Sequence, residues 1–404
     1  MYTYAMKRFI EKECRYGAKN YSPLPVCINK GKGVYLTDYN SKKYLDFISA
    51  YSAVNQGHCH PRLINVLNTQ ASELTLTSRA LYNSILGDYM EKACTTFNYD
   101  KLLPMNTGVE GGETAIKLAR MWGYKKKMVE SNKAINLFCS NNFWGRTLAA
   151  VSSSSDPMCY QNFGPFMNGF QMIDYNDSCA LEHAFKENKN IVSFMVEPIQ
   201  GEAGIIIPDD TYLTEVRELC NEYDVLMIAD EVQTGLGRTG KMLACDYEDV
   251  KPDILVLGKA LSGGMMPISA VLADSNVMDV IEPGTHGSTF GGNPLAAAVA
   301  LEALAVIKDE DLVGNSYIQG KYFREQLRAL ASTKIINCRG RGLLNAIDLE
   351  SESKASALSA SLLQHGLLAK TTHGSTLRLS PPLCITRAQI DTALCIIETS
   401  LSEI

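Results

Sequence analysis

An acidic and a basic residue each follow a short apolar run near the middle of the chain. Residues 225–229 lead directly into Asp230, and residues 254–257 lead through Gly258 into Lys259. Runs of Val, Ile and Leu of this length are typical of strands that are buried on both faces. Open α/β sheets bind ligands at the ends of such strands. Because an unpaired ammonium group is costly to bury, we expect Lys259 either to pair with Asp230 or to form part of a site.

The reactions that Lys259 can carry out depend on whether its amine is protonated. A lysine in a dry site can lose that proton and form a Schiff base with an aldehyde. Pyridoxal phosphate needs such a lysine, a carboxylate for its ring nitrogen and donors for its phosphate. Asp230 can supply the carboxylate, and Phe143 an aromatic ring for stacking. The small-residue turn at 106–109 opens a helix whose free N–H groups favour an anion, and residues 287–289 add two hydroxyls.

A second phosphate motif competes with this interpretation. Residues 235–241 match GxxxxGK, the start of a nucleotide-binding loop. The next residue is Met242, where magnesium coordination requires Ser or Thr, and the preceding strand ends too early to present the loop. We interpret the match as accidental and keep a nucleotide-binding protein as the remote alternative.

Composition excludes several classes of protein. With 404 residues, 46% hydrophobic and 20% charged, the chain is typical of a globular protein. A net charge of −6 argues against nucleic acid or an anionic membrane as the main partner. Twelve cysteines without a CxxC pair predict reduced, mostly buried thiols. We expect no metal site and no membrane span. The N-terminal region lacks an apolar signal core and carries Glu11 and Glu13, which predicts a cytoplasmic protein.

The order of the apolar runs predicts the fold. Runs at 135–139, 191–199, 225–230 and 254–258 alternate with helical stretches, and 268–273 is a further strand. This alternation predicts an α/β fold with a mostly parallel, doubly wound sheet. We expect an extended, hairpin-bearing segment up to about Asn55, helices from Pro294 to about Ala331, and a smaller α+β region after them.

Several stretches resemble one enzyme family. Residues 229–240 read ADEVQTGLGRTG and residues 258–264 read GKALSGG. Together with FMVEPIQGEAG at 194–204 and HGSTFGGNPL at 286–295, they resemble the subgroup-III (ω-amino-acid) aminotransferases, in the family order along nearly the whole chain. The resemblance implies a fold-type-I transferase that uses pyridoxal 5'-phosphate. It also implies a large cofactor-binding domain at 56–308, a small domain at 309–404, and an N-terminal segment, 1–55, that packs with the small domain.

For the cofactor ring, the resemblance implies four roles. Lys259 forms the Schiff base and moves the proton, and Asp230 keeps the ring nitrogen protonated. Gln233 contacts the 3'-oxygen, and Phe143 stacks on the ring.

For the phosphate, the resemblance implies that Gly108 and Val109 bind through backbone N–H groups. Ser288 and Thr289 then complete the phosphate site from the neighbouring subunit, which implies a homodimer with active sites at the interface.

For the substrates, the resemblance implies that Tyr21 and Arg146 bind the α-carboxylate and α-amino end of ornithine, with Tyr51 lining the same pocket. Arg378 receives the α-carboxylate of glutamate or 2-oxoglutarate, and Glu202 pairs with Arg378 while ornithine reacts. From the residues alone, Arg378 and Glu202 could also be a plain ion pair, and Tyr51 could be a core residue.

The implied reaction is a ping-pong transamination. The δ-amino group of ornithine passes to 2-oxoglutarate, giving glutamate and glutamate 5-semialdehyde, which cyclises to pyrroline-5-carboxylate. N-acetylornithine and 4-aminobutyrate stay alternative substrates, although Tyr21 and the FWGRT at 143–147 favour ornithine. Gly111 and Phe290 depart from the family pattern, where we expect an alanine or serine and a tyrosine.

Overall fold

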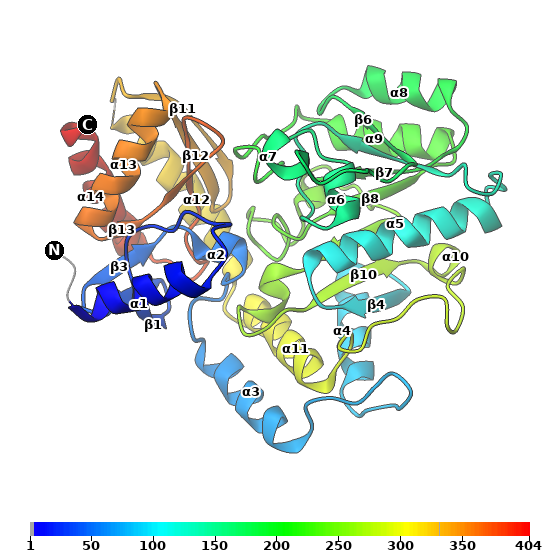
Figure 1. Ribbon diagram of the computed structural model, residues 1–404, viewed down its shortest axis with the longest axis horizontal. Helices are drawn as coiled ribbons and strands as arrows, with labels where there is room; N and C mark the ends of the chain where they lie inside the picture. Colours follow the sequence, from blue (N-terminus) through cyan, green and yellow to red (C-terminus); the bar gives the residue numbers. More distant parts are fainter. Residues whose placement is uncertain (1–3, 331) are drawn as a thin grey trace.

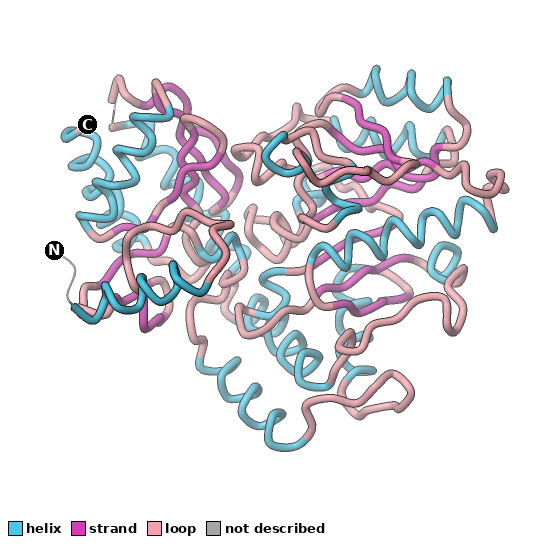
Figure 2. Tube along the Cα trace, in the orientation of Figure 1, coloured by secondary structure: helices cyan, strands magenta, loops and turns pink. Residues whose placement is uncertain are grey.

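The protein has two lobes that lie side by side (Figure 1). The computed structural model describes residues 4–330 and 332–404. The larger lobe contains a seven-stranded sheet, and the smaller lobe contains both ends of the chain and two four-stranded sheets. In the large lobe, the strands lie between helices (Figure 2). Within the described residues, no helix is long and apolar enough to cross a membrane.

The large sheet is mostly parallel, as the alternation of apolar runs predicts. Its five strands from β9 to β6 run parallel, and β10 is antiparallel to both β9 and β4. In spatial order, the strands are β4 (Lys101–Met105), β10 (Ser269–Ala273), β9 (Ile254–Leu257), β8 (Leu226–Asp230), β7 (Ile191–Val196), β5 (Ile135–Cys139) and β6 (Phe170–Ile173). The sequence pattern did not predict β4 or β6. Both are edge strands, β4 contains Pro104, and β6 is only partly buried, so neither shows a buried apolar run.

Alternate residues of the central strands enter two different cores. Leu137, Phe194 and Met227 pack with helices on one face of the sheet. Their neighbours Phe138 and Met195 pack with residues of α5 (Gly108–Lys125) on the other face. Because successive side chains point to opposite faces and both faces are covered, each strand appears in the sequence as a continuous apolar run.

The helices of the large lobe are α3 (Pro61–Glu73), α4 (Leu86–Phe97), α5, α6 (Leu148–Ser152), α7 (Pro157–Tyr160), α8 (Ser178–Glu187), α9 (Tyr212–Glu222), α10 (Ser275–Met278) and α11 (Pro294–Asp309), with 3-10 turns η1 (Ala244–Tyr247) and η2 (Lys259–Ser262).

The two chain ends meet in the small lobe. Strand β3 (Lys43–Asp46) pairs in parallel with β13 (Leu367–Leu368). The first small sheet has the order β1 (Ile28–Lys32), β2 (Tyr35–Asp38), β3, β13. The second has the order β11 (Ile335–Arg341), β12 (Leu344–Leu349), β15 (Thr376–Leu379), β14 (Lys370–Thr372). The helices of this lobe are α1 (Tyr4–Tyr16), α2 (Ser49–Ser52), α12 (Leu312–Ala329), α13 (Glu352–His365) and α14 (Arg387–Glu403).

Two local predictions were wrong. The segment before Asn55 is not extended throughout, because α1 precedes the predicted hairpin of β2 and β3. Packing of Phe9 against Tyr39, with ring centroids 5.1 Å apart, explains how this charge-rich helix is held. The cysteines are not mostly buried either: four of the twelve are buried, namely Cys139, Cys159, Cys220 and Cys245.

Candidate active site

Asp230 and Lys259 lie at the same edge of the large sheet. Strands β8 and β9 are adjacent and parallel, with Asp230 opposite Val256, so both residues lie at the carboxyl ends of their strands. Lys259 has a φ of +42°, a strained value for a residue other than glycine and one that often marks a functional position. No ion pair joins the two side chains, nor does Lys259 pair with any other carboxylate in the part of the chain that the structure describes. The first alternative, an Asp230–Lys259 pair, is therefore wrong.

Both side chains face one cavity of about 240 Å³, called the cofactor cavity here. It contains every cofactor residue predicted for a single chain, although these residues come from four separate segments. Its lining is Gly108, Val109, Phe143, Trp144, Gly145, Glu197, Glu202, Asp230, Val232, Gln233, Thr234 and Lys259.

The start of α5 is built to bind an anion. Thr107 caps the helix and forms a capping box with Glu110. In the described chain no group accepts a hydrogen bond from the backbone N–H of Gly108 or Val109, so both donors are free at the positive end of the helix. A Cβ atom at Gly108 would lie 2.8 Å from Val232 Cγ1, which explains the glycine. A phosphate fits this turn.

Ser288 and Thr289 lie outside the cofactor cavity of their own chain. The hydroxyl oxygen of Ser288 accepts hydrogen bonds from Asn106 Nδ2 at 2.9 Å and from the Gly291 backbone N–H at 3.0 Å. Thr289 is exposed. Asn106 directly precedes Thr107, the N-cap of α5. The loop that contains Ser288 is therefore hydrogen-bonded to the start of α5 in the same chain.

The charges in the cofactor cavity are strongly perturbed. Burial raises the pKa of Asp230 to about 6. Burial also lowers the pKa of Lys259, although Glu202 and Asp230 act in the opposite direction. A lysine with a lowered pKa is more readily available as the neutral amine that an aldehyde requires. Together with the free amides of α5, this amine and carboxylate fit pyridoxal phosphate.

Glu197 is a carboxylate of the cavity that the sequence analysis missed. Its side chain accepts hydrogen bonds from the backbone N–H of Phe143 at 2.8 Å and of Gly201 at 3.3 Å. Burial and the neighbouring Asp230 raise the pKa of Glu197 to about 8. Glu197 follows the apolar strand β7 as Asp230 ends β8, so a search for carboxylates at strand ends could have found it.

Arg378 and Glu202 form an ion pair beside the cavity. Arg378 Nη1 lies 2.7 Å from Glu202 Oε1 and 3.4 Å from Gln233 Oε1, and Gln233 Nε2 donates to Glu202 at 2.9 Å. Burial alone would raise the pKa of Glu202, but the charges of Arg378 and Lys259 lower it to about 2. The guanidinium of Arg378 also lies 4.9 Å from the ring centroid of Tyr51. The structure therefore brings Tyr51, Arg378 and Glu202 together.

Tyr21 and Arg146 lie at the exposed side of this region. Tyr21 is 71% exposed. Burial raises the pKa of Tyr51, and Tyr21 is near enough to add a small contribution to that rise. The guanidinium of Arg146 lies 5.5 Å from the ring centroid of Phe143. Within the described residues neither side chain makes a hydrogen bond or ion pair, which leaves both free for a ligand.

The competing phosphate motif does not form an open loop. Residues 235–240 are buried, and the backbone N–H groups of Gly235, Gly237 and Gly240 donate to carbonyl groups of the protein itself. A phosphate has no access to them. The segment contains Arg238 instead, whose side chain is fully buried.

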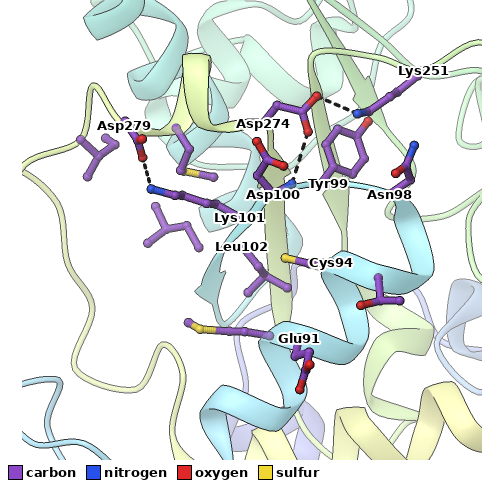
Figure 3. Close-up of a pocket in the computed structure, with 15 residues that line it drawn as sticks. Glu91, Cys94, Asn98, Tyr99, Asp100, Lys101, Leu102, Lys251, Asp274 and Asp279 are labelled. Atoms are coloured by element: carbon purple, nitrogen blue, oxygen red, sulfur yellow. Dashed lines mark hydrogen bonds and ion pairs between the residues drawn. The ribbon is translucent and has the colours of Figure 1, made fainter.

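A larger cavity lies elsewhere. It has a volume of about 940 Å³ and lies between α4 and the start of β4. Its charged residues form the ion pairs Lys101–Asp279 and Lys251–Asp274 (Figure 3). Because β4 begins at Lys101 and leads toward Gly108, this cavity lies at the edge of the sheet opposite the cofactor cavity. Among the described residues, no group of three or more His, Cys, Asp or Glu side chains could hold a metal ion.

Comparison with known proteins assigns the chain to a family. The model of the family described as Aminotransferase class-III matches residues 16–401. The chain belongs to this family. It is a pyridoxal-phosphate-dependent transaminase with a fold of type I, which confirms the predicted fold and cofactor. 

Three named relatives show how close the likeness is. "Ornithine aminotransferase, mitochondrial" of Drosophila melanogaster is 55% identical over 96% of this chain and 90% of its own length. A crystal structure of the ornithine aminotransferase from Toxoplasma gondii has a TM-score of 0.97 and 47% identity, covering 100% of this chain and 96% of the other. The structure of an acetylornithine aminotransferase from Elizabethkingia anophelis has a TM-score of 0.91 and 49% identity, covering 99% of each chain.

Proposed function

We propose that this transaminase moves the δ-amino group of L-ornithine to 2-oxoglutarate. The products are glutamate and glutamate 5-semialdehyde, which cyclises to pyrroline-5-carboxylate. The observation that carries the choice is the ion pair of Arg378 with Glu202, 2.7 Å apart beside the cofactor cavity. The named ornithine aminotransferases at 47–55% identity support it.

The ion pair gives a physical reason for using the distal amine. An uncovered guanidinium beside Lys259 would bind the α-carboxylate of ornithine and present the α-amine for reaction. Glu202 covers Arg378 and so removes that binding mode. The pKa of Glu202, lowered to about 2, keeps the carboxylate charged at neutral pH. 2-Oxoglutarate carries two carboxylates and can compete with Glu202 for Arg378.

The other end of ornithine needs a separate binding site. Tyr21 and Arg146 are the free groups on the exposed side, and we assign them to the α-carboxylate and α-amino end. Tyr51, which stacks over Arg378, would line the channel between these two ends. With the α-carboxylate held outside, the δ-amine is the group that reaches Lys259.

We assign the cofactor to the residues that line the cofactor cavity. Gly108 and Val109 would hold the phosphate, Phe143 would stack on the ring, and Gln233 would contact the 3'-oxygen. When bound, pyridoxal phosphate supplies an aldehyde that condenses with amines and a ring that accepts electrons when a substrate C–H bond breaks. Asp230 would hold the proton on the ring nitrogen.

Lys259 acts as the acid–base group in this proposal. It would first hold the cofactor aldehyde and then, displaced by the δ-amine, take a proton from the Cδ atom of ornithine. Its lowered pKa favours the neutral amine that this transfer needs.

We further propose a homodimer, in which Ser288 and Thr289 complete the phosphate site of the partner. Exposed apolar residues support this assignment: Leu81, Tyr82 and Phe290 are all large and open to solvent in the single chain. Light scattering of the purified protein tests it, and a monomer with full activity would contradict it.

The division into segment 1–55, large domain 56–308 and small domain 309–404 is also a proposal. It is supported by the pairing of β3 with β13 and by the hydrogen bond of 2.6 Å from Lys42 Nζ to the Gln364 carbonyl. A cytoplasmic location is a further proposal. Because named relatives are mitochondrial, cell fractionation has to decide it.

A comparison of amino donors tests the substrate. The purified holoenzyme is given ornithine, N-acetylornithine or 4-aminobutyrate with 2-oxoglutarate, and glutamate is measured. We expect kcat/KM to be highest for ornithine. A higher value for N-acetylornithine would overturn the proposal and favour the activity named for the relative from Elizabethkingia anophelis.

A further inference from the structure

Arg238 is a buried cation that the proposed chemistry does not use. Its side chain has no exposed surface, and it forms no ion pair within the described residues. Three neutral oxygens accept its hydrogen bonds: the carbonyls of Leu343 at 3.0 Å and Pro381 at 2.6 Å, and Asn55 Oδ1 at 2.5 Å. Burial lowers the pKa of Arg238 to about 9. A buried charge without a carboxylate partner is unfavourable, so its presence calls for a specific role.

Two of the three oxygens belong to segments that carry proposed substrate-binding residues. Pro381 lies three residues after Arg378, and Asn55 lies four residues after Tyr51. Arg238 itself lies five residues after Gln233, which contacts both Glu202 and Arg378. The guanidinium of Arg238 therefore links the segments that contain Asn55 and Pro381 to its own segment. All three segments lie close to residues that we assign to substrate binding.

Further hydrogen bonds tie the same segments together. The carbonyl of Asn55 accepts from the Leu383 N–H at 2.8 Å, and Asn55 Nδ2 donates to the Leu236 carbonyl at 3.0 Å. Ser49 Oγ donates to the Ser380 carbonyl at 2.5 Å. 

The turn that carries Tyr51 needs such support. Ser49, Ala50, Tyr51 and Ser52 all have positive φ values, between 45° and 72°. L-residues rarely adopt this conformation because it is sterically unfavourable, so the turn depends on its surroundings.

We propose that Arg238 is a positioning residue that sets Arg378 and Tyr51 relative to Gln233 and Lys259, and thereby sets the affinity for the α-keto acid. Arg378 depends on Arg238 through the Pro381 carbonyl. Tyr21 and Arg146, assigned to the α-carboxylate and α-amino end of ornithine, lie in segments that Arg238 does not contact. Tyr51 lines the ornithine channel without holding that end, so ornithine binding should depend on Arg238 less than 2-oxoglutarate binding does. The choice of 2-oxoglutarate and ornithine as substrates rests on the proposed function. The positioning role of Arg238 rests on its hydrogen bonds instead.

The test is Arg238→Lys in the holoenzyme, which keeps the charge but cannot reach three acceptors at once. We expect the KM for 2-oxoglutarate to rise about tenfold or more, because small displacements of a binding group have large kinetic effects. The KM for ornithine and the single-turnover rate with ornithine should change less than about threefold. The visible absorbance of the bound cofactor should not change.

The matched control is Arg217→Lys. Arg217 is also partly buried and pairs with Asp253 at 2.7 Å, but it lies near the amino end of β8, away from the cofactor cavity. This variant should lose stability without a change in the ratio of the two KM values. If Arg238→Lys does not fold, Asn55→Ala removes one acceptor and should raise the KM for 2-oxoglutarate in the same direction, by a smaller factor.

The ratio of the KM for 2-oxoglutarate to the KM for ornithine decides the test. If this ratio is the same as in the wild type in both Arg238→Lys and Asn55→Ala, whether the two KM values stay constant or rise equally, the inference is overturned. A failure of the proposed function would be seen in the wild-type enzyme instead, as no turnover with ornithine. In that case the same variants are compared with the amino donor that the wild-type enzyme does use.

Discussion

Both edges of the large sheet carry charged residues around a cavity. The charged residues are enclosed by protein at one edge and exposed as ion pairs at the other. At the carboxyl edge, Glu197, Asp230 and Lys259 are enclosed by protein around about 240 Å³, and burial shifts the pKa of each. At the amino edge, a cavity of about 940 Å³ is bordered by the exposed ion pairs Lys101–Asp279 and Lys251–Asp274 (Figure 3).

The difference supports the burial of charge, and not the size of a cavity, as the feature that marks the proposed active site. Exposed partners neutralise each other in water and gain little from the protein. Lys259 has no such partner within the described chain, so its free energy depends on what enters the cavity. The same substitutions at the two edges should therefore have very different effects.

Lys259→Ala has the largest expected effect. Loss of the amine removes the proton transfer and should lower kcat by about four orders of magnitude. Steady-state turnover of ornithine measures kcat, and absorbance of the dialysed protein measures whether cofactor is still bound. Bound cofactor with wild-type turnover would exclude the assigned role of Lys259.

Glu202→Gln should have a smaller and more selective effect. Without the carboxylate, Arg378 is uncovered, so the α-carboxylate of ornithine can bind there and present the wrong amine. We expect kcat/KM for ornithine to fall about tenfold, while the KM for 2-oxoglutarate falls. Glu202→Asp, which keeps the charge, is the control. Equal losses for both substrates would contradict the covering role.

Glu197→Gln should change how stability depends on pH. The pKa of Glu197 is about 8 when folded, against 4.5 for an ordinary glutamate, so the folded protein holds a proton that the unfolded chain has lost. Its stabilising contribution is complete below pH 4.5 and disappears as the pH rises through about 8.

Urea unfolding of the cofactor-free protein between about pH 5 and 8 measures this dependence. The free energy of unfolding should fall with rising pH in the wild type and stay flatter in Glu197→Gln. The exposed Glu218→Gln serves as the control. Parallel curves for wild type and Glu197→Gln would show that Glu197 does not titrate in this window.

Lys251→Met tests the amino edge and should have the smallest effect. Lys251 and Asp274 lie 2.7 Å apart and are both about 40% exposed. Exposed pairs of this kind contribute less than about 1 kcal/mol. Thermal unfolding and turnover should both stay close to wild type. A loss of activity there would mean that the larger cavity takes part in the reaction.

The sequence allowed a site residue to be predicted where that residue directly follows an apolar strand or begins a helix. Asp230 and Lys259 could be found because each follows an apolar strand, and Gly108 because it opens a helix. These three residues do line one cavity. Edge strand β6 and helix α1 were missed because partly buried edges and charged helices lack a clear apolar period.

Arg238 could not have been found in this way. Its partners lie near residues 55, 343 and 381, and only the folded chain brings these segments together. The sequence showed a glycine-rich motif around it and suggested a phosphate site, whereas the glycines serve close packing. A Cβ atom at Gly240, for example, would lie 2.9 Å from the Tyr317 backbone.

A spectral titration of the holoenzyme tests the central claim most directly. Ornithine is added first, without an acceptor, and 2-oxoglutarate is added afterwards. We predict that ornithine removes the visible absorbance of the cofactor at one equivalent per active site, and that 2-oxoglutarate restores it. A visible band that ornithine leaves unchanged would contradict the account.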